Sequence, residues 1–286
     1  MIFMLGIDAM ENPCSPDKLS TFRFRRRTPG TFVLVPCPLL GRSIRCQGQL
    51  EAAAAVVLAA CPQVCDIREQ PVQIWYALHD NAPEAEAELL PGRPSGTVRG
   101  KARVSYVIPD FLVEMTTGEK RLIEIKPSRK LADAIVARKL SVSRTYALAQ
   151  GWSFHAITER ELFRSALVSN LRLLGRFRQR TADPEAAARL VDMIRRRPFT
   201  VRQILTSLAV SMDGMQIRAV LWHLVATRQL DVDPTIGPLS DDTFIHPEGA
   251  ILWEPFDSVW GPSGSLMDVR SASFVKRGPT NSWHGT

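Results

Sequence analysis

The sequence lacks any long apolar run and any export signal at its N-terminus. A helix that crosses a membrane needs about 20 consecutive apolar residues. The opening stretch Met1–Gly6 has neither the basic flank nor the length of a signal peptide. We therefore expect a soluble, cytoplasmic protein.

Cysteine and histidine motifs are sparse as well. The five cysteines include no C-x-x-C pair, and the five histidines include no H-x-x-x-H pair. An odd number of unpaired cysteines favours free, reduced thiols, with a zinc site as the less favoured alternative. The histidine spacing therefore supports neither a histidine-rich metal site nor a Ser-His-Asp triad. The sequence also contains no G-x-x-x-x-G-K-[ST] loop, the motif that would indicate a nucleotide-binding site.

The charge that is present is mainly positive. With 36 Lys and Arg against 29 Asp and Glu, the formal net charge is +7, and the pI is near 9.5. A basic surface attracts polyanions such as nucleic acid, so this balance favours a nucleic-acid partner. A length of 286 residues is sufficient for two domains that each bury a core.

The stretch from Val104 to Pro127 predicts a β-hairpin that carries two carboxylates and a lysine. Its first arm runs to Met115, its second from Arg121, and Thr116–Gly118 supplies the turn. If Met115 faces Glu119, then Asp110 pairs with Glu124, and Lys126 lies one step beyond on the same face. The predicted faces, by period-2 alternation, are Tyr106, Ile108, Asp110 and Leu112 on one arm and Leu122, Glu124 and Lys126 on the other.

Two carboxylates held this close repel each other unless a cation neutralises them. Mg²⁺ is typically bound by one or two carboxylates, with water and substrate phosphate as its other ligands. A neighbouring lysine orients or deprotonates an attacking water, or stabilises charge on a phosphate. The hairpin alone is equally compatible with a solvent-facing strand pair that carries an ordinary Glu/Lys ladder.

Glu51 is the one charge on an otherwise apolar helix, predicted from Gly48 to Cys61 and stopped by Pro62. A lone carboxylate is costly to bury unless it is paired or bound to metal. We favour a role in the same acidic site, because the hairpin needs a third acid. The alternative is a glutamate that satisfies backbone donors at the positive end of the helix.

The elements around the hairpin predict an α/β core. A strand is expected over Asp66–Tyr76, an exposed acidic loop over Asp80–Gly100, a crossover helix capped by Ser128 and running to Gln150, and a strand over Trp152–Ile157. Leu131, Ile135 and Tyr146 are the expected buried positions of the crossover helix.

Pro109-Asp110 followed by Glu124-Ile125-Lys126 resembles the PD-(D/E)xK motif of restriction-endonuclease-like nucleases. The order of elements, with Leu50-Glu51, Glu69-Gln70-Pro71 and Gly151-Trp152 at matching places, resembles the TnsA family over about residues 42 to 160. That family supplies the endonuclease subunit of heteromeric transposases of the Tn-seven type.

The resemblance implies a Mg²⁺-dependent endonuclease, with Mn²⁺ as a substitute, that cuts the non-transferred (5′) strands at transposon ends. It assigns Glu51, Asp110, Glu124 and Lys126 to catalysis, the three acids also being metal ligands. It implies double-stranded DNA, a DDE-type transposase and an ATPase regulator as partners, in a bacterial cytoplasm with nucleoid association in the complex. The alternatives are a free-standing restriction or repair nuclease and an inactive nuclease fold that serves as a DNA-binding scaffold.

Beyond the core, Thr158–Glu161 is a capping box that opens a helix running to Leu174. Asp183-Pro184 begins a second unit with helices to Arg196, over Thr200–Leu208 and over Met215–Arg228. Strands near Leu230 and Phe244 complete a helix-turn-helix or winged-helix-like pattern, in which Gln216, Arg218 and His223 are exposed candidates on the third helix. Such folds bind DNA or protein, and the sequence favours neither.

We predict an N-terminal arm over 1–41 that includes a short strand at Thr31–Leu34, an endonuclease domain over 42–180, the helical domain over 181–260 and a flexible tail over 261–286. The basic run Thr21–Arg27 is either a DNA contact or a solvated strand. The candidate DNA-binding residues are Arg25, Arg26, Arg129, Lys130, Lys139 and Arg218.

Overall fold

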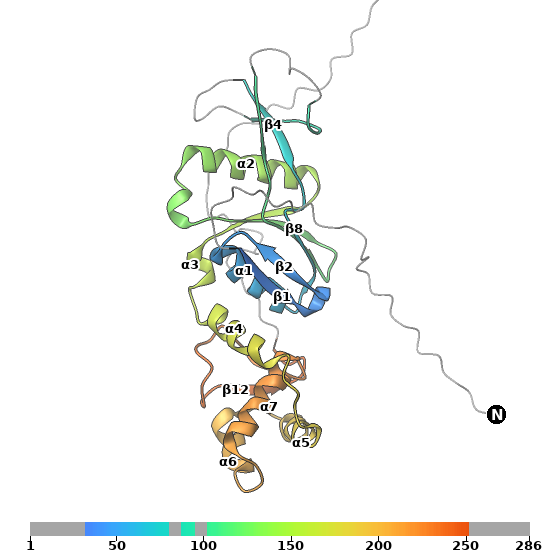
Figure 1. The fold of residues 1–286 in the computed structure, drawn as a ribbon, viewed down its shortest axis with the longest axis vertical. Coiled ribbons are helices and arrows are strands. Elements are labelled where there is room, and N and C mark those ends of the chain that lie inside the picture. Colours follow the sequence, from blue (N-terminus) through green and yellow to red (C-terminus); the bar gives the residue numbers. More distant parts are fainter. Residues whose placement is uncertain (1–31, 80–86, 95–101, 252–286) are drawn as a thin grey trace, which may run out of the picture.

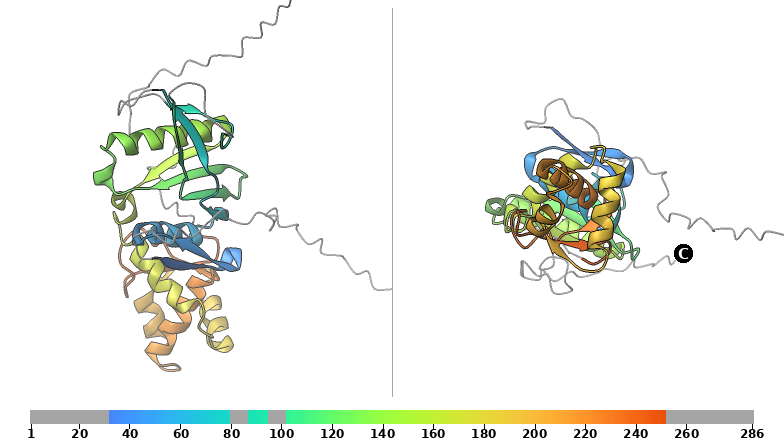
Figure 2. Two further views of the ribbon diagram at one scale, coloured as in Figure 1. Left: turned by 45° about the horizontal axis from the view of Figure 1, so that its top comes forward. Right: turned by 90° about the horizontal axis from the view of Figure 1, so that it is seen from below.

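The computed structural model describes residues 32–79, 87–94 and 102–251, which form a mixed α/β structure. Along the long axis in Figure 1, α2 (Ala134–Ala149) and β4 (Ile74–Leu78) lie at one end. The middle holds α1 (Gln49–Ala60), β1 (Val33–Cys37) and β2 (Arg42–Cys46), and the other end holds α5 (Pro184–Ile194), α6 (Val201–Leu208) and α7 (Gly214–Ala226). Figure 2 shows the same division from two further sides. The basic run with Arg25 and Arg26 and the tail over 261–286 lie outside the described residues.

A four-stranded sheet forms the centre of the α/β part. Its order is β3 (Val64–Glu69), β7 (Phe111–Met115), β8 (Lys120–Ile125) and β9 (Ser153–Ile157). β3, β7 and β8 pair antiparallel, whereas β8 and β9 pair parallel. Helix α2 (Ala134–Ala149) makes the crossover that a parallel pair requires, as predicted.

The predicted hairpin register is confirmed. The Met115 amide donates to the Glu119 carbonyl at 2.8 Å, and Gly118 closes the turn with a φ of 82°. Phe111 pairs with Ile123, so the same register continued by one residue places Asp110 opposite Glu124. The turn therefore sets the alignment of the two carboxylates.

Two predicted long strands are wrong, because each breaks at a proline and its parts enter different sheets. The stretch 104–115 divides at Pro109 into β6 (Arg103–Val107) and β7, and the stretch 66–76 divides at Pro71 into β3 and β4 (Ile74–Leu78). A proline has no amide hydrogen for the ladder. The second sheet has the order β5-β4-β6, with β5 (Ala87–Leu89) in the stretch predicted to be a loop.

Helix α1 (Gln49–Ala60) has the predicted extent and is buried along most of its length. A hairpin of β1 (Val33–Cys37) and β2 (Arg42–Cys46), joined by the 3₁₀ turn η1 (Pro38–Leu40), packs against it. The structure thus differs from the predicted arm over 1–41, since β1 continues through Pro36 and belongs to the α/β part. Pro36 is compatible with β1 because the strand has only one neighbour among the described strands.

The crossover helix begins later than predicted. Ser128 starts the 3₁₀ turn η2 (Ser128–Lys130), and Asp133 caps α2 by accepting from the amides of Ile135 and Val136 at 2.8 and 3.2 Å. Of the positions predicted to be buried, Ile135 is 54% exposed in the first turn of α2, and Leu131 and Tyr146 are half-buried. Gly151 ends the helix as predicted, with a φ of 72°.

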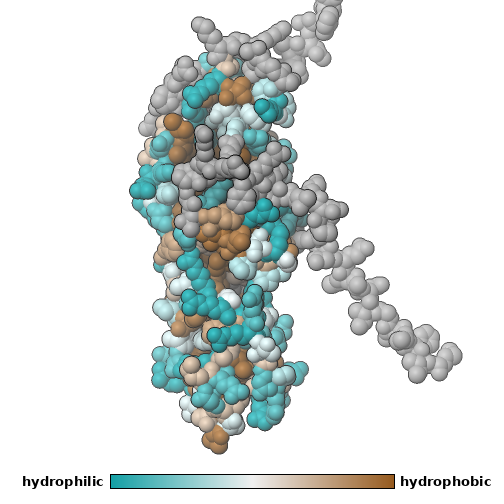
Figure 3. Space-filling view, in the orientation of Figure 1, coloured by the Kyte–Doolittle hydropathy of each residue, from teal (hydrophilic) through white to brown (hydrophobic). Residues whose placement is uncertain are grey.

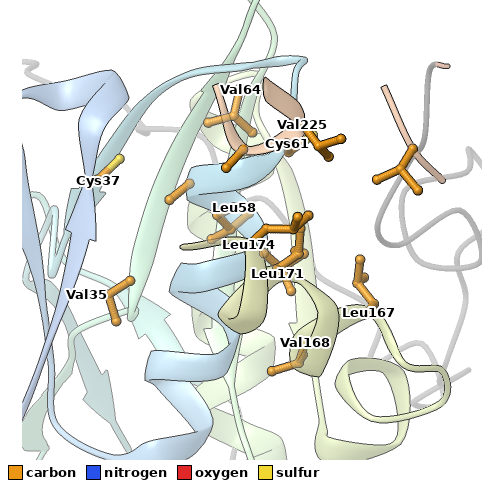
Figure 4. Close-up of a cluster of buried hydrophobic side chains, with 14 of the residues drawn as sticks. Val35, Cys37, Leu58, Cys61, Val64, Leu167, Val168, Leu171, Leu174 and Val225 are labelled. Carbon is orange, nitrogen blue, oxygen red and sulfur yellow. The ribbon is translucent and has the colours of Figure 1, made fainter. Parts of the chain in front are cut away.

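The single helix predicted to join the two ends of the molecule is divided into two helices. The predicted capping box opens α3 (Glu159–Leu162), but a separate helix, α4 (Leu167–Phe177), follows in place of one continuous helix. Figure 4 shows Leu171 and Leu174 of α4 beside Leu58 of α1. This apolar contact joins the α/β part to the helices beyond it.

The predicted elements after residue 183 are present. Asp183 caps α5 (Pro184–Ile194), Thr200 caps α6 (Val201–Leu208) in a capping box, and Asp213 caps α7 (Gly214–Ala226). The strands β10 (Phe199–Thr200), β12 (Phe244–Pro247) and β11 (Leu230–Asp231) form a small sheet in that order. Hydrophilic residues cover much of this end in Figure 3.

No helix in the described part of the chain is long and apolar enough to cross a membrane. The cysteines at positions 37 and 46 are free thiols, as expected, and Cys14 lies outside the described residues.

Candidate active site

Asp110, Glu124 and Lys126 meet at the end of β8 where the hairpin joins the second sheet. The Lys126 Nζ lies 2.5 Å from Glu124 Oε1 and 3.7 Å from Asp110 Oδ2. The structure therefore brings together the two carboxylates and the lysine that the hairpin register predicts.

Asp110 is fixed on both its main chain and its side chain. Its Oδ2 accepts from the Ile125 amide at 2.6 Å, and its carbonyl accepts from the Gln70 amide at 2.9 Å. Burial raises the pKa of Asp110, although Lys126 and the Ile125 amide favour the charged form. Asp110, which directly follows the strand break at Pro109, is thus a carboxylate that is rigidly held and poorly solvated.

Glu124 is more deeply buried, with a side chain only 4% exposed. Its Oε2 is buried and has no hydrogen-bond partner among the described residues. Burial and the charge of Asp110 raise the pKa of Glu124 to about 8, although Lys126 lies against it. An unpartnered carboxylate oxygen at this depth is costly unless something else binds it.

Glu51 combines the two roles that the sequence left open. It lies in the first turn of α1, and its Oε2 accepts from the Gln47 amide at 2.7 Å, as expected of a residue that satisfies backbone donors. Burial and the charge of Asp110 raise its pKa to about 7, which means that it also lies within the field of the acidic cluster.

Lys126 is a cation in this arrangement. Burial lowers its pKa, but Asp110 and Glu124 outweigh this effect and raise the pKa above the ordinary value. Its Nζ also donates to the Ile125 carbonyl at 3.2 Å. A lysine held as an ammonium orients water and stabilises negative charge, and it does not deprotonate water.

The cluster contains carboxylate oxygens, the type of ligand that a hard divalent cation prefers. Within the described ranges, no three His, Cys, Asp or Glu side chains are arranged closely enough to enclose an ion, and the Lys126 ammonium compensates Asp110 and Glu124. However, the buried Oε2 of Glu124 and the raised pKa values of Glu51 and Glu124 are features that a bound cation would relieve.

The predicted DNA-binding residues divide into exposed and engaged side chains. Arg129 and Lys130 are on η2, directly after the lysine of the cluster, and Lys139 is half-buried on α2. Arg218 is not a free surface cation, because its guanidinium forms a two-pronged ion pair with Asp241, one contact being 2.9 Å.

Two interactions near the cluster, one ion pair and one hydrogen-bonded pair, were not predicted from the sequence. Glu69, only 1% exposed, accepts from Arg42 at 2.7 Å and from the Arg45 amide at 3.1 Å. Glu159 accepts from the Ser128 amide at 2.8 Å and from the Ser128 hydroxyl. Glu69 stands in the Glu-Gln-Pro series that carried the resemblance, whereas nothing in the sequence signals the pairing of Ser128 with Glu159.

Residues 61–159 match a family model described as the TnsA-like endonuclease N-terminal domain. The resemblance to the TnsA family is confirmed. The match spans Asp110, Glu124 and Lys126 and begins after Glu51, later than the predicted start near residue 42. A search of curated proteins found no match to the chain. The TnsA-like domain supports a nuclease role in transposition of the Tn-seven type.

Proposed function

We propose that the chain is a Mg²⁺-dependent DNA endonuclease that cleaves the non-transferred (5′) strands at transposon ends, as a subunit of a heteromeric transposase. The observation that carries the proposal is the buried Glu124 carboxylate opposite Asp110, with the Lys126 ammonium against both, inside a TnsA-like domain. Double-stranded DNA, a DDE-type transposase and an ATPase regulator are the proposed partners, in a complex associated with the bacterial nucleoid.

Glu51, Asp110 and Glu124 are the residues that would hold Mg²⁺, or Mn²⁺ in its place. When bound, such an ion supplies Lewis-acid stabilisation of the phosphate and acidifies water. Asp110 is kept in one orientation by the Ile125 amide. Lys126 places a positive charge where negative charge develops on the phosphate, and its N–H groups orient the attacking water.

The proposal is tested by mapping cuts separately on each strand of DNA that bears candidate transposon ends, with the partner transposase present. We expect 5′-strand cuts that leave a 5′-phosphate and a 3′-hydroxyl, and that disappear when a chelator removes divalent cations. Strand cuts that survive chelation would contradict the metal-dependent chemistry.

The basic surface next to the acidic cluster gives a further prediction. The double change Arg129→Ala and Lys130→Ala should weaken DNA binding about equally for all sequences, because both side chains follow Lys126 on an accessible turn and suit phosphate binding. We expect the slope of log affinity against log salt to fall by about 1 for each phosphate interaction that the change removes. Titrations of fluorescent duplex DNA over a range of salt concentrations measure it.

Arg218→Ala is the matched control for this experiment, because the Arg218 charge is already paired with Asp241. It should leave the salt slope unchanged. A larger decrease in DNA affinity from Arg218→Ala than from the double change would show that the helical unit, and not η2, binds the phosphates.

The order α5, β10, α6, α7, β11, β12 leads us to propose a winged-helix-like unit at the C-terminal end, whose partner is a protein. Helix α7 is packed against α4, α5 and α6, so most of its surface is buried. His223, predicted to be exposed, lies against α4 with its Nδ1 3.0 Å from the Phe177 carbonyl. Of the three predicted candidates on this helix, only Gln216 is exposed, which leaves little of α7 to enter a DNA groove.

A further inference from the structure

A cavity of about 530 Å³ lies between α1, α4 and the C-terminal unit, away from the acidic cluster. Pockets that bind ligands or side chains of a partner commonly have volumes of about 300–1,000 Å³. Its apolar wall comes from the β1 hairpin, α1, α4 and α7, including Val35, Val56, Leu171, Leu174 and Val225. The cavity therefore offers a sizeable apolar surface where the two ends of the molecule meet.

Its rim carries more basic than acidic residues. Arg172, Arg176, Arg178 and Arg228 line it, against Asp231 and Glu248. Arg178 donates to the Ala226 carbonyl at 3.0 Å and Arg228 to the Ala60 carbonyl at 2.6 Å. Arg172 and Arg176 are exposed on α4 and have no ion pair with any described residue. A suitable occupant is therefore apolar and acidic.

The described part of the chain leads directly to this cavity. Ile251 lines it, and the Ile251 amide donates to Asp231 Oδ2 at 3.2 Å. The next residues, 252–260, read Leu-Trp-Glu-Pro-Phe-Asp-Ser-Val-Trp and lie outside the described residues. They combine three aromatic side chains with two acids and contain no Lys or Arg.

We propose that the segment of residues 252–260 occupies this cavity. Its aromatic residues suit the apolar wall, and Glu254 and Asp257 are complementary to Arg172 and Arg176. Because Ile251 already stands at the wall, the tether keeps the segment at a high effective concentration there. The segment then fastens α4 and the C-terminal unit to the end of α1, the helix that carries Glu51 at its other end.

The proposal is tested in the full chain with a photo-reactive benzoylphenylalanine at position 256, which retains an aromatic ring. We expect an intramolecular cross-link to residues of α1, α4 or α7 that line the cavity, identified by mass spectrometry. Cross-links only between chains, or to surfaces away from the cavity, would overturn the proposal. If the cavity binds another protein in place of this segment, no intramolecular cross-link will form, and that result would likewise overturn the proposal.

A pair of tryptophan changes supplies a second measurement. Trp253→Ala should lower the Tm of the full chain by about 4 °C or more, because a large aromatic side chain is then removed from an apolar wall. Trp283→Ala is the control, because Trp283 lies outside the proposed segment, and it should leave the Tm unchanged. Equal Tm values for the two variants and the parent chain would contradict the proposal.

Discussion

Asp110→Asn should reduce 5′-strand cleavage by the assembled transposase on the order of 100-fold or more, the scale seen when one charge-stabilising group is removed from an active site. Asparagine retains an oxygen that accepts from the Ile125 amide, so the end of β8 keeps its geometry. It lacks the charge that binds a cation and that faces Lys126. The initial rate of strand-specific cutting measures the reduction.

The same variant separates an active nuclease from an inactive DNA-binding scaffold. Mg²⁺ or Mn²⁺ should raise the Tm of the parent protein, because a ligand that binds only the folded state stabilises it, and Asp110→Asn should remove this rise. Glu114→Gln on β7 is the matched control and should keep the full response, because Glu114 pairs with Arg68 and Lys120 and not with the cluster. A scaffold would show no metal-dependent rise in any variant.

Glu124→Gln should flatten the pH dependence of stability in metal-free buffer while it abolishes cleavage. Burial raises the pKa of Glu124 to about 8 in the folded protein, against about 4.3 for an exposed glutamate. Between these values the folded chain keeps a proton that the unfolded chain releases, so stability falls as the pH rises from about 5 to 8. Glutamine resembles the protonated form and does not ionise.

Denaturant unfolding at about pH 5.5 and about pH 8 measures this effect. The parent protein should be less stable at the higher pH without divalent cations, and Mg²⁺ should restore much of the stability because it binds the ionised carboxylates. The stability of Glu124→Gln should still fall somewhat as the pH rises, since burial also raises the pKa of Glu51 to about 7. A variant with the same slope as the parent would show that Glu124 is ionised throughout this range.

Local signals in the sequence predict the parts of the fold that depend on neighbours in the chain. The turn at Thr116–Gly118 sets the register of β7 and β8, so the sequence alone places Asp110 and Glu124 opposite each other. The helix that carries Glu51 is recognisable because a long apolar stretch ends at Pro62. Both are short-range effects of turn chemistry and side-chain pattern.

Contacts between distant segments decide the rest. After Gln70 and before Asp110 the chain passes from one sheet to the other, because β3 pairs with β7 whereas β4 pairs with β6. The side-chain alternation along the sequence is the same whether or not the chain changes sheet, so it does not predict the change. The cap of α2 is Asp133 and not Ser128, which lies in a separate 3₁₀ turn and donates to Glu159, a residue distant in sequence. The pairing of Arg218 with Asp241 depends on the packing of the loop before β12, which no local pattern indicates.

The most direct test of the central claim compares the parent chain with Lys126→Ala in strand-specific mapping of cuts on DNA with candidate transposon ends, in the presence of the partner transposase and Mg²⁺. Lys126 is the one cation in contact with both hairpin carboxylates among the described residues. The account predicts that the variant no longer makes the 5′-strand cuts, while the partner's cuts on the other strand persist. Persistence of the 5′-strand cuts in Lys126→Ala would contradict the assignment of this site.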